Sequence, residues 1–233
     1  VPDGLGIVEE FEYLKRNTRS RIKATCPGPL TLTIHIQIRD TSVYKNRLDL
    51  AWDMAGAVNA ELKALAAAGA ELIQIDEPSF AIIPGEAEEW VRLLNAATEG
   101  VPARLAVHVC FGNLGSRPRG RRDYRPFFPA LHEVRCDQFS FEFANRELKE
   151  ASIYRDVGLD REFAAGVIDV KSFYAETPQD VAERIRSILQ YVPADRLWLT
   201  PDCGFFQLPR WLCFLKLKAL VEGTRIVRKE LAG

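Results

Sequence analysis

From residue 70 onward, short apolar runs alternate with longer stretches in which apolar residues recur every three or four positions. The short runs are typical of buried strands, and the three-and-four spacing is typical of helices. The alternation predicts strands at 71–75, 104–109, 138–143, 165–170 and 196–200. It predicts helices between them at 86–97, 126–133, 145–156 and 178–190. The remaining pattern predicts a strand at 20–25 and helices at 46–68 and 210–231.

Repeated strand–helix units of this length predict an α/β fold with a parallel sheet and right-handed crossovers. The closed form of such a fold is the (β/α)8 TIM barrel, which has eight strands, whereas the pattern here gives about six. We therefore expect a TIM barrel that lacks its first one or two βα units in this chain, or that another chain completes. The first residue is Val1 and not Met, which suggests that the chain starts inside a longer gene product.

Composition narrows the class of protein. The 233 residues are 47% apolar and 27% charged, which suits one soluble globular domain over 1–233. A formal net charge of −1 argues against nucleic acid or a membrane surface as the main partner. There is no apolar run of the ~18 residues that a transmembrane helix needs, and no signal-peptide pattern. Five cysteines at irregular spacing favour reduced thiols in the cytoplasm.

Candidate chemistry lies at the predicted strand ends. His108 and Cys110 are two positions apart on a strand, so their side chains point to the same side. Glu142 and Cys203 each end a later apolar run, and a parallel barrel gathers the carboxyl ends of its strands at one face. A lone His-x-Cys pair is more often structural. Together, however, an imidazole, two thiolates and a carboxylate form a donor set that suits zinc.

The charge of such a centre indicates its chemistry. Two thiolates and one carboxylate outweigh the charge of Zn²⁺ by one unit, so the centre is a poor Lewis acid for activating water. It is better suited to binding an incoming thiol, lowering the pKa of that thiol and keeping its sulfur nucleophilic. The hard oxygen of Glu142 is the ligand that is most easily loosened. The donor set therefore predicts alkyl transfer to a thiol.

Several motifs occur in the order seen in the catalytic domain of cobalamin-independent methionine synthase, a family that the chain resembles over nearly its whole length. These motifs are Thr25-Cys-Pro-Gly-Pro-Leu-Thr31, Ile73-Gln-Ile-Asp-Glu-Pro78, His108-Val-Cys110, Phe141-Glu142, Gly166-Val-Ile-Asp169 and Pro201-Asp-Cys-Gly204. The resemblance implies a (β/α)8 barrel, methyl transfer to homocysteine in methionine biosynthesis, and zinc held by His108, Cys110, Glu142 and Cys203. It also implies that Asp76 holds the amino group of homocysteine.

Two departures from the family pattern leave the methyl donor open. The family's first units have no match here, and Lys171 occupies the place of a histidine that is thought to assist methyl departure from folate. In addition, 108–113 and 123–128 look like a shorter second branch, which lacks the folate-binding half and includes epoxyalkane:coenzyme M transferase. Alternatives to homocysteine methylation are therefore the alkylation of coenzyme M by an epoxide, or a non-catalytic paralogue that zinc stabilises.

Other polar residues are weaker candidates for the site. Lys171 is hypothesised to stabilise the leaving group as a cation. Glu77 either contacts the substrate or caps the strand end, and Arg121 lies in an Arg-rich loop at 117–125. That loop is either solvated or a mobile lid that pairs with an anionic donor or thiol. Two further carboxylates are expected to orient His108 or to support the ligands: Asp169 and Asp202. A homo-oligomer is one option for assembly.

Overall fold

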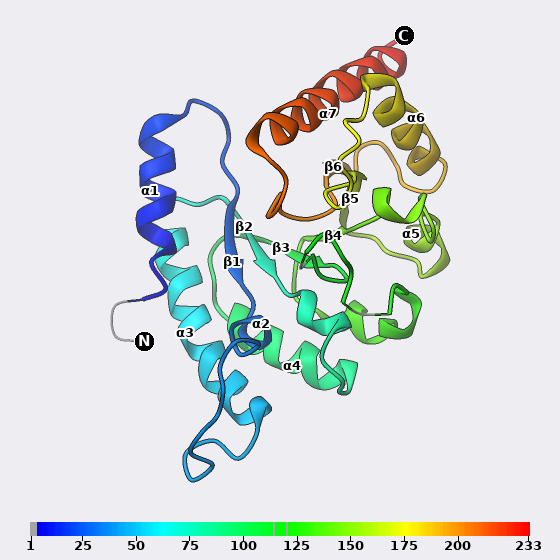
Figure 1. Cartoon of the computed structure of the whole chain (residues 1–233). Coiled ribbons are helices and arrows are strands. Elements are labelled where there is room, and N and C mark those ends of the chain that lie inside the picture. Colours follow the sequence, from blue (N-terminus) through cyan, green and yellow to red (C-terminus); the bar gives the residue numbers. More distant parts are fainter. Residues whose placement is uncertain (1–3, 114, 120) are drawn as a thin grey trace. The chain divides into compact units, whose positions relative to one another are not determined.

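The computed structural model describes residues 4–113, 115–119 and 121–233, and its strands and helices alternate along the chain (Figure 1). The chain divides into two compact units. Unit 1 comprises Val1–His108 and Pro129–Asp137, and unit 2 comprises Val109–Phe128 and Gln138–Gly233. Among the described residues, no helix is long and apolar enough to cross a membrane. The single domain expected over 1–233 stays a prediction.

Unit 1 is built on parallel strands that run side by side. They are β1 (Ala24–Pro27), β2 (Leu72–Asp76) and β3 (Arg104–Val109), of which β3 ends one residue into unit 2. The helices are α1 (Ile7–Asn17), α2 (Pro29–Leu32), α3 (Arg47–Ala67) and α4 (Ala87–Thr98), with 3-10 turns at Pro78–Ala81 and Ala130–Glu133. Strands β2 and β3 are almost continuously apolar because both of their faces are covered.

Unit 2 repeats this arrangement with β4 (Gln138–Phe141), β5 (Glu162–Ile168) and β6 (Leu197–Pro201), whose neighbouring pairs are also parallel. Its helices are α5 (Ile153–Asp156), α6 (Pro178–Leu189) and α7 (Arg210–Leu231), with 3-10 turns at Arg125–Phe127 and Ala144–Arg146. The core is aromatic. The ring of Phe141 lies 5.5 Å from that of Phe139 and 5.6 Å from that of Phe163, measured between centroids.

Backbone pairing links the strands in the order β1-β2-β3-β4-β5-β6. The predicted α/β fold with about six parallel strands is therefore confirmed. Within the part of the chain that the structure describes, this order begins at β1 and ends at β6. The carboxyl ends of parallel strands carry functional residues in such folds, and the predicted metal ligands and Asp76 lie at or just beyond those ends.

Two of the helices predicted from the sequence are much shorter in the structure or are 3-10 turns. Residues 126–133 form two short 3-10 turns, and only Ile153–Asp156 of the predicted 145–156 helix is α-helical. The reason in the second case is backbone conformation, because Glu147, Leu148 and Glu150 have positive φ values of 51°, 60° and 64°. A left-handed residue interrupts an α-helix. The first strand also lies at 24–27 and not at 20–25.

Helix α1 was not predicted, and a remote carboxylate holds its start. Glu61 of α3 is 4% exposed and accepts hydrogen bonds from the backbone amides of Leu5 (2.7 Å), Ile7 (2.8 Å) and Val8 (3.2 Å). No side chain at the N-cap residue, Gly6, does so. The negative charge also suits the positive end of the helix dipole. Glu61 thus replaces a local N-cap.

We expect Glu61→Ala to lower the free energy of unfolding by about 1–3 kcal/mol, because it leaves these amide donors without their charged acceptor. Chemical denaturation measures the loss, and hydrogen exchange should show it concentrated in α1. The matched control is Glu12→Gln, since Glu12 is half-exposed on α1 and forms a surface ion pair with Arg16 at 3.6 Å. It should change stability by less than about 0.5 kcal/mol. Equal effects of the two substitutions would contradict the capping role.

Candidate metal centre and active site

Two cysteines of unit 2 lie close together, each just beyond the carboxyl end of a strand. Cys110 directly follows β3 and is buried, and Cys203 lies two residues beyond β6. Their sulfur atoms are 3.8 Å apart, the separation expected of two thiolates on one tetrahedral zinc ion (about 3.8 Å). Hydrogen bonding to Cys203, together with burial, raises the pKa of the Cys110 thiol well above its ordinary value. Only a cation would stabilise both as thiolates here.

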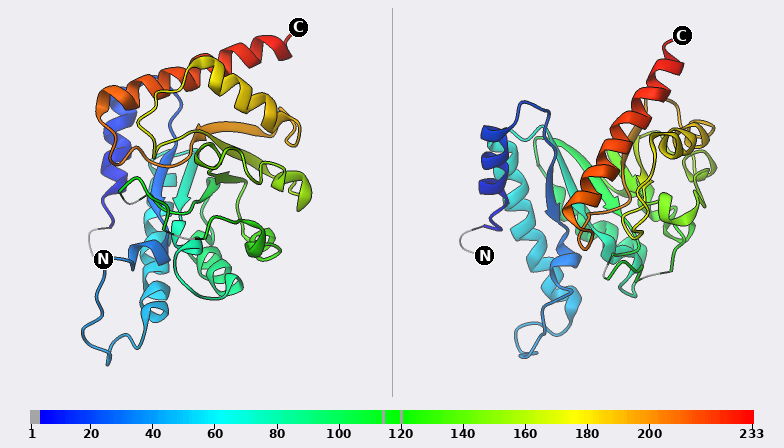
Figure 2. Two further views of the ribbon diagram at one scale, coloured as in Figure 1. Left: turned by 45° about the vertical axis from the view of Figure 1, so that its right-hand side comes forward. Right: turned by 45° about the horizontal axis from the view of Figure 1, so that its top comes forward.

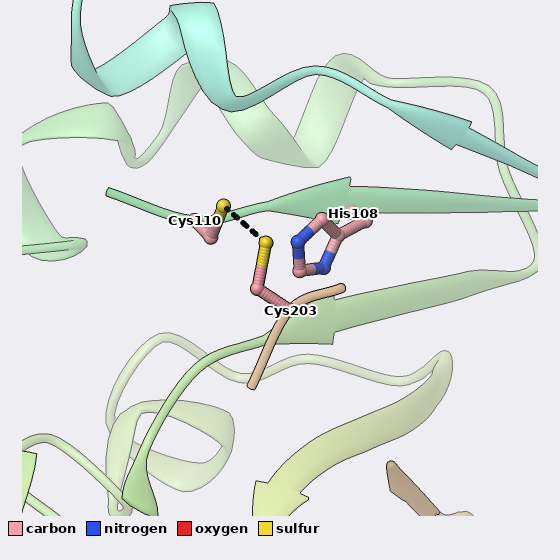
Figure 3. Close-up of side chains that lie close together, drawn as sticks. All are labelled: His108, Cys110 and Cys203. Carbon is pink, nitrogen blue, oxygen red and sulfur yellow. Dashed lines mark hydrogen bonds between the residues drawn. The ribbon is translucent and has the colours of Figure 1, made fainter. Parts of the chain in front are cut away.

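His108 joins the cysteine pair through the backbone of one continuous strand. His108 lies on β3, two positions before Cys110, and side chains at this spacing point to the same side of a strand. The boundary between the two units falls after His108, inside this strand. One ligand atom each of His108, Cys110 and Cys203 lies within 4.8 Å of the others. Figure 3 shows the imidazole and both sulfurs turned toward one another. The structure thus brings together three of the four predicted ligands.

Glu142, the fourth predicted ligand, is fully buried directly after β4. It is not part of the His–Cys–Cys group. Its Oε2 accepts hydrogen bonds from Lys171 Nζ (3.0 Å) and from the Phe111 amide (3.4 Å). Its Oε1 is buried and has no hydrogen-bond partner among the residues that the structure describes. A buried carboxylate oxygen without a partner is costly, and a metal ion would satisfy it.

Tyr124, which the sequence analysis missed, fixes the backbone at Glu142. Its hydroxyl accepts a hydrogen bond from the Glu142 amide (2.8 Å) and donates one to the Val109 carbonyl (3.1 Å). Tyr124 is fully buried, and burial raises its pKa well above the ordinary value, so the hydroxyl stays protonated. It therefore links the end of β3, next to Cys110, to the position that carries Glu142.

Lys171 places a positive charge against the predicted ligand. Its side chain is 2% exposed, and its ammonium nitrogen lies 3.0 Å from Glu142 Oε2. Burial alone would lower the pKa of Lys171. The negative charge of Glu142, aided by Asp202, outweighs burial and raises that pKa. Lys171 is therefore a cation held in one position by a buried ion pair.

Asp202 supports the segment that follows Glu142. Its Oδ1 accepts hydrogen bonds from the amides of Phe143 and Ala144 (both 2.9 Å), and its Oδ2 accepts one from the Asn145 amide (2.7 Å). Burial raises the pKa of Asp202 to about 7, although these amides act in the opposite direction. Of the two roles expected for Asp202, the contacts favour support of the ligand segment over the orientation of His108.

Asp76 and His108 are neighbours on adjacent strands of unit 1, where their Cα atoms pair in register. A short chain of side chains orients Asp76. Gln74 Nε2 donates to Asp76 Oδ1 at 2.7 Å, and Lys23 Nζ donates to Gln74 Oε1 at 2.5 Å. Because Gln74 and Asp76 are two apart on β2, they share one side of the strand. The arrangement presents Asp76 as a carboxylate beside the histidine.

With this geometry established, the relatives of the chain can be considered. Residues 6–225 match the family model described as cobalamin-independent synthase, catalytic domain. The chain belongs to this family. It is 36% identical over 226 residues to a methionine synthase of Saccharolobus solfataricus. This match covers 97% of this chain and 64% of the relative. A methionine synthase of Sulfurisphaera tokodaii is 34% identical, covering 97% of this chain and 62% of the relative.

Solved structures of the cobalamin-independent synthase family agree with the sequence match. A B12-independent methionine synthase from Shewanella sp. W3-18-1, in complex with selenomethionine, superposes with a TM-score of 0.86 and 33% identity. The match covers 98% of this chain and 68% of that chain. A methyltransferase from Methanosarcina mazei shares the fold, with a TM-score of 0.69 at 18% identity. The chain spans 64% of the length of the Saccharolobus solfataricus methionine synthase and 62% of the length of the Sulfurisphaera tokodaii one.

Glu77 differs from its neighbour Asp76 in being fully enclosed. It is 2% exposed and accepts hydrogen bonds from the Leu30 amide (3.1 Å) and the Thr31 hydroxyl at the start of α2. Burial raises its pKa to about 7. Gly28 permits this approach, since a Cβ there would lie 2.2 Å from the carboxylate. These contacts hold the carboxylate at the start of α2, and the role of Glu77 in substrate binding stays a prediction.

Two of the five arginines of the 117–125 loop are bound to other segments of unit 2. Arg122 donates to the Asn145 side chain at 2.8 Å, and Arg125 donates to Asp156 at 2.6 Å. Arg121 is 84% exposed and lies 3.7 Å from Asp123. Its predicted role in substrate binding stays a prediction. Gly120, inside this loop, lies outside the described residues.

A second buried charge cluster, also missed from the sequence, holds the loop that carries Lys171. Lys216 of α7 donates to Glu176 at 2.7 Å and to the Asp169 carbonyl at 2.8 Å. Glu176 accepts a further hydrogen bond from the Asp169 amide at 2.8 Å, and Asp169 Oδ1 accepts one from the Lys171 amide at 2.7 Å. One signal was present in the sequence, because Lys216 lies in the buried stripe of α7 with Leu212 and Ala219.

Proposed function

We propose that this chain is the catalytic part of a zinc-dependent methyltransferase that methylates the thiol of homocysteine and forms methionine. The observation that carries the proposal is the 3.8 Å approach of Cys110 and Cys203, with His108 beside them, in a member of the cobalamin-independent synthase family. The names of the relatives support it, as does the selenomethionine held by the Shewanella protein. Selenomethionine differs from the proposed product only in the chalcogen.

Zinc is the metal that best fits the donor set. The site offers two sulfurs, one imidazole and the unpartnered Glu142 Oε1, and this borderline-soft ion accepts all three kinds of ligand. When bound, zinc would lower the pKa of an incoming thiol while leaving its sulfur able to attack carbon. The proposed ligands are therefore His108, Cys110, Cys203 and Glu142.

The other proposed roles follow from charge. Asp76, oriented by Gln74, is a carboxylate for the ammonium group of the amino acid. Lys171 holds Glu142 Oε2 and so keeps the second oxygen free to face a ligand. As a cation it would also stabilise negative charge that develops on a leaving group. The partners are thus a small-molecule thiol and a methyl donor, and Glu77 and Arg121 remain candidates for contacts with them.

The test is incubation of the zinc-loaded protein with homocysteine or coenzyme M and a panel of methyl and alkyl donors, with thioethers detected by mass. We expect methionine from homocysteine. X-ray absorption at the zinc edge should show one further Zn–S contact when homocysteine is added, because a catalytic zinc site keeps an open position. A coenzyme M thioether alone would replace the proposed acceptor. No thioether and an unchanged Zn–S number would indicate a structural zinc site.

A further inference from the structure

The hydroxyl of Tyr124 lies between the ends of two strands that lead into proposed metal ligands. It accepts a hydrogen bond from the Glu142 amide at 2.8 Å and donates one to the Val109 carbonyl at 3.1 Å. Val109 is the last residue of β3 and precedes Cys110, whereas Glu142 directly follows β4. Neighbouring strands usually join an amide to a carbonyl directly. Here a side-chain hydroxyl bridges such a pair of groups.

The ring that carries this hydroxyl is held on several sides. Tyr124 is fully buried, and its ring centroid lies 4.5 Å from that of Phe111 and 4.4 Å from that of Phe141. The guanidinium group of Arg146 lies over the same ring, 5.2 Å from its centroid. The Tyr124 amide donates to the carboxylate of Glu150 at 3.1 Å. Because close-packed side chains have little room to move, the ring gives the hydroxyl a rigid support.

Three contacts restrain Glu142, and each acts on a different part of the chain there. Strands β4, β5 and β6 run side by side in unit 2 (Figure 2), and Lys171 and Asp202 follow β5 and β6. Lys171 binds the carboxylate of Glu142, and Asp202 binds the amides of the segment that follows it. Tyr124 binds the amide of Glu142 itself. This last contact fixes the point on the backbone from which the carboxylate side chain begins.

The position of that point matters because Glu142 has one oxygen left for a ligand. Its Oε1 is buried and has no hydrogen-bond partner among the described residues. Zinc–oxygen bonds are about 2.0–2.2 Å long, so a shift of the backbone moves a carboxylate out of reach. We propose that Tyr124 is a positioning residue whose hydroxyl holds Glu142 where its carboxylate can bind the metal. The inference rests on the proposed function, because it takes Glu142 as a zinc ligand.

The test is the zinc affinity of Tyr124→Phe, which removes the hydroxyl and keeps the ring. Competition with a chromophoric chelator should show binding weakened about 10- to 100-fold, the usual cost of losing a group that supports a ligand. X-ray absorption at the zinc edge should show fewer Zn–O contacts and an unchanged number of Zn–S contacts. The matched control is Tyr154→Phe, since Tyr154 is also buried and its ring lies 5.4 Å from that of Phe163. The control should change affinity less than twofold, because Phe163 lies at the amino-terminal end of β5, opposite the strand ends that lead into the ligands.

A double variant separates positioning from a general loss of stability. Glu142→Gln weakens the ligand itself, so adding Tyr124→Phe to it should cost less than twofold in further zinc affinity. Additive losses would overturn the inference, because the hydroxyl would then act by a route other than Glu142. Unchanged affinity in Tyr124→Phe alone would overturn it too. If Glu142→Gln itself binds zinc as tightly as the unchanged chain, both the ligand assignment and the inference fail.

A measurement on the unchanged chain does not depend on how well a variant folds. Without zinc, the Glu142 amide should already exchange slowly with solvent, because its bond to the Tyr124 hydroxyl does not need the metal. Rapid exchange of this amide would contradict the inference. These readouts are metal binding and amide exchange. If they come out as expected but no donor yields a thioether, the proposed function fails and the role of Tyr124 stands.

Discussion

Cys203→Ser should reduce zinc affinity by more than about 100-fold and abolish methionine formation. Removing even the residues that support metal ligands costs roughly 10- to 100-fold in affinity, and Cys203 is proposed as a direct ligand. Its sulfur is 3.8 Å from that of Cys110. A serine hydroxyl in its place is neutral and a poorer donor for a borderline-soft ion. Zinc analysis after dialysis against a competing chelator measures the affinity, and detection of methionine by mass measures the activity.

The matched control for Cys203→Ser is Cys213→Ser. Cys213 is also a partly exposed cysteine of unit 2, but it lies in the first turn of α7, where its sulfur donates a hydrogen bond to the Leu208 carbonyl at 3.5 Å. Its replacement should leave zinc content and activity unchanged. Cys110→Ser should resemble Cys203→Ser, and the double variant should be little worse than either, because the two residues act as one unit. Full zinc retention in Cys203→Ser would contradict the proposed metal centre.

The approach of His108, Cys110 and Cys203 could be predicted because strand geometry and strand order determine it. Two residues separated by one position on a strand share a side, and this fixes His108 next to Cys110 whatever the rest of the fold does. Cys203 lies near Cys110 because the carboxyl ends of parallel strands lie at the same edge of a sheet.

The partners of these residues could not be predicted, because they come from segments far apart in sequence. Tyr124 contacts Glu142 from 18 positions away, and Lys171 contacts it from 29. No periodicity links such positions. The contacts of Glu77 likewise depend on Leu30, 47 residues earlier. The sequence therefore shows that Asp76 and Glu77 end a strand, but not which of them is enclosed.

The short helix α5 illustrates a different limit. Apolar spacing over 145–156 satisfies a helical pattern, yet three residues between 147 and 150 adopt left-handed conformations. A buried ion pair lies within the same segment, since Arg146 pairs with Glu150 while both side chains are at most 5% exposed. Glu150 also accepts the Tyr124 amide at 3.1 Å. Tertiary contacts therefore outweigh the local preference for helix here.

Lys171→Met should lower kcat for methyl transfer by about 100-fold or more, in line with the loss of one preorganised electrostatic group. The reason is that Lys171 is a buried cation 3.0 Å from Glu142. Zinc content should be retained, and KM for homocysteine should change less than about threefold, since the proposed role is in the transition state. Lys171→Arg, which keeps the charge, should recover part of the rate. Steady-state kinetics on zinc-loaded protein measures both constants.

Stability separates this catalytic role from a merely structural one. Removing one partner of a buried ion pair typically costs about 3–5 kcal/mol, because the other charge stays buried. Metal-free Lys171→Met should therefore unfold more easily, and adding Glu142→Gln should restore much of that loss by removing the orphaned carboxylate. The double variant tests stability alone, because Glu142 is itself a proposed zinc ligand. Unimpaired transfer by Lys171→Met would exclude a catalytic role. No gain in stability on adding Glu142→Gln would contradict the importance of the ion pair.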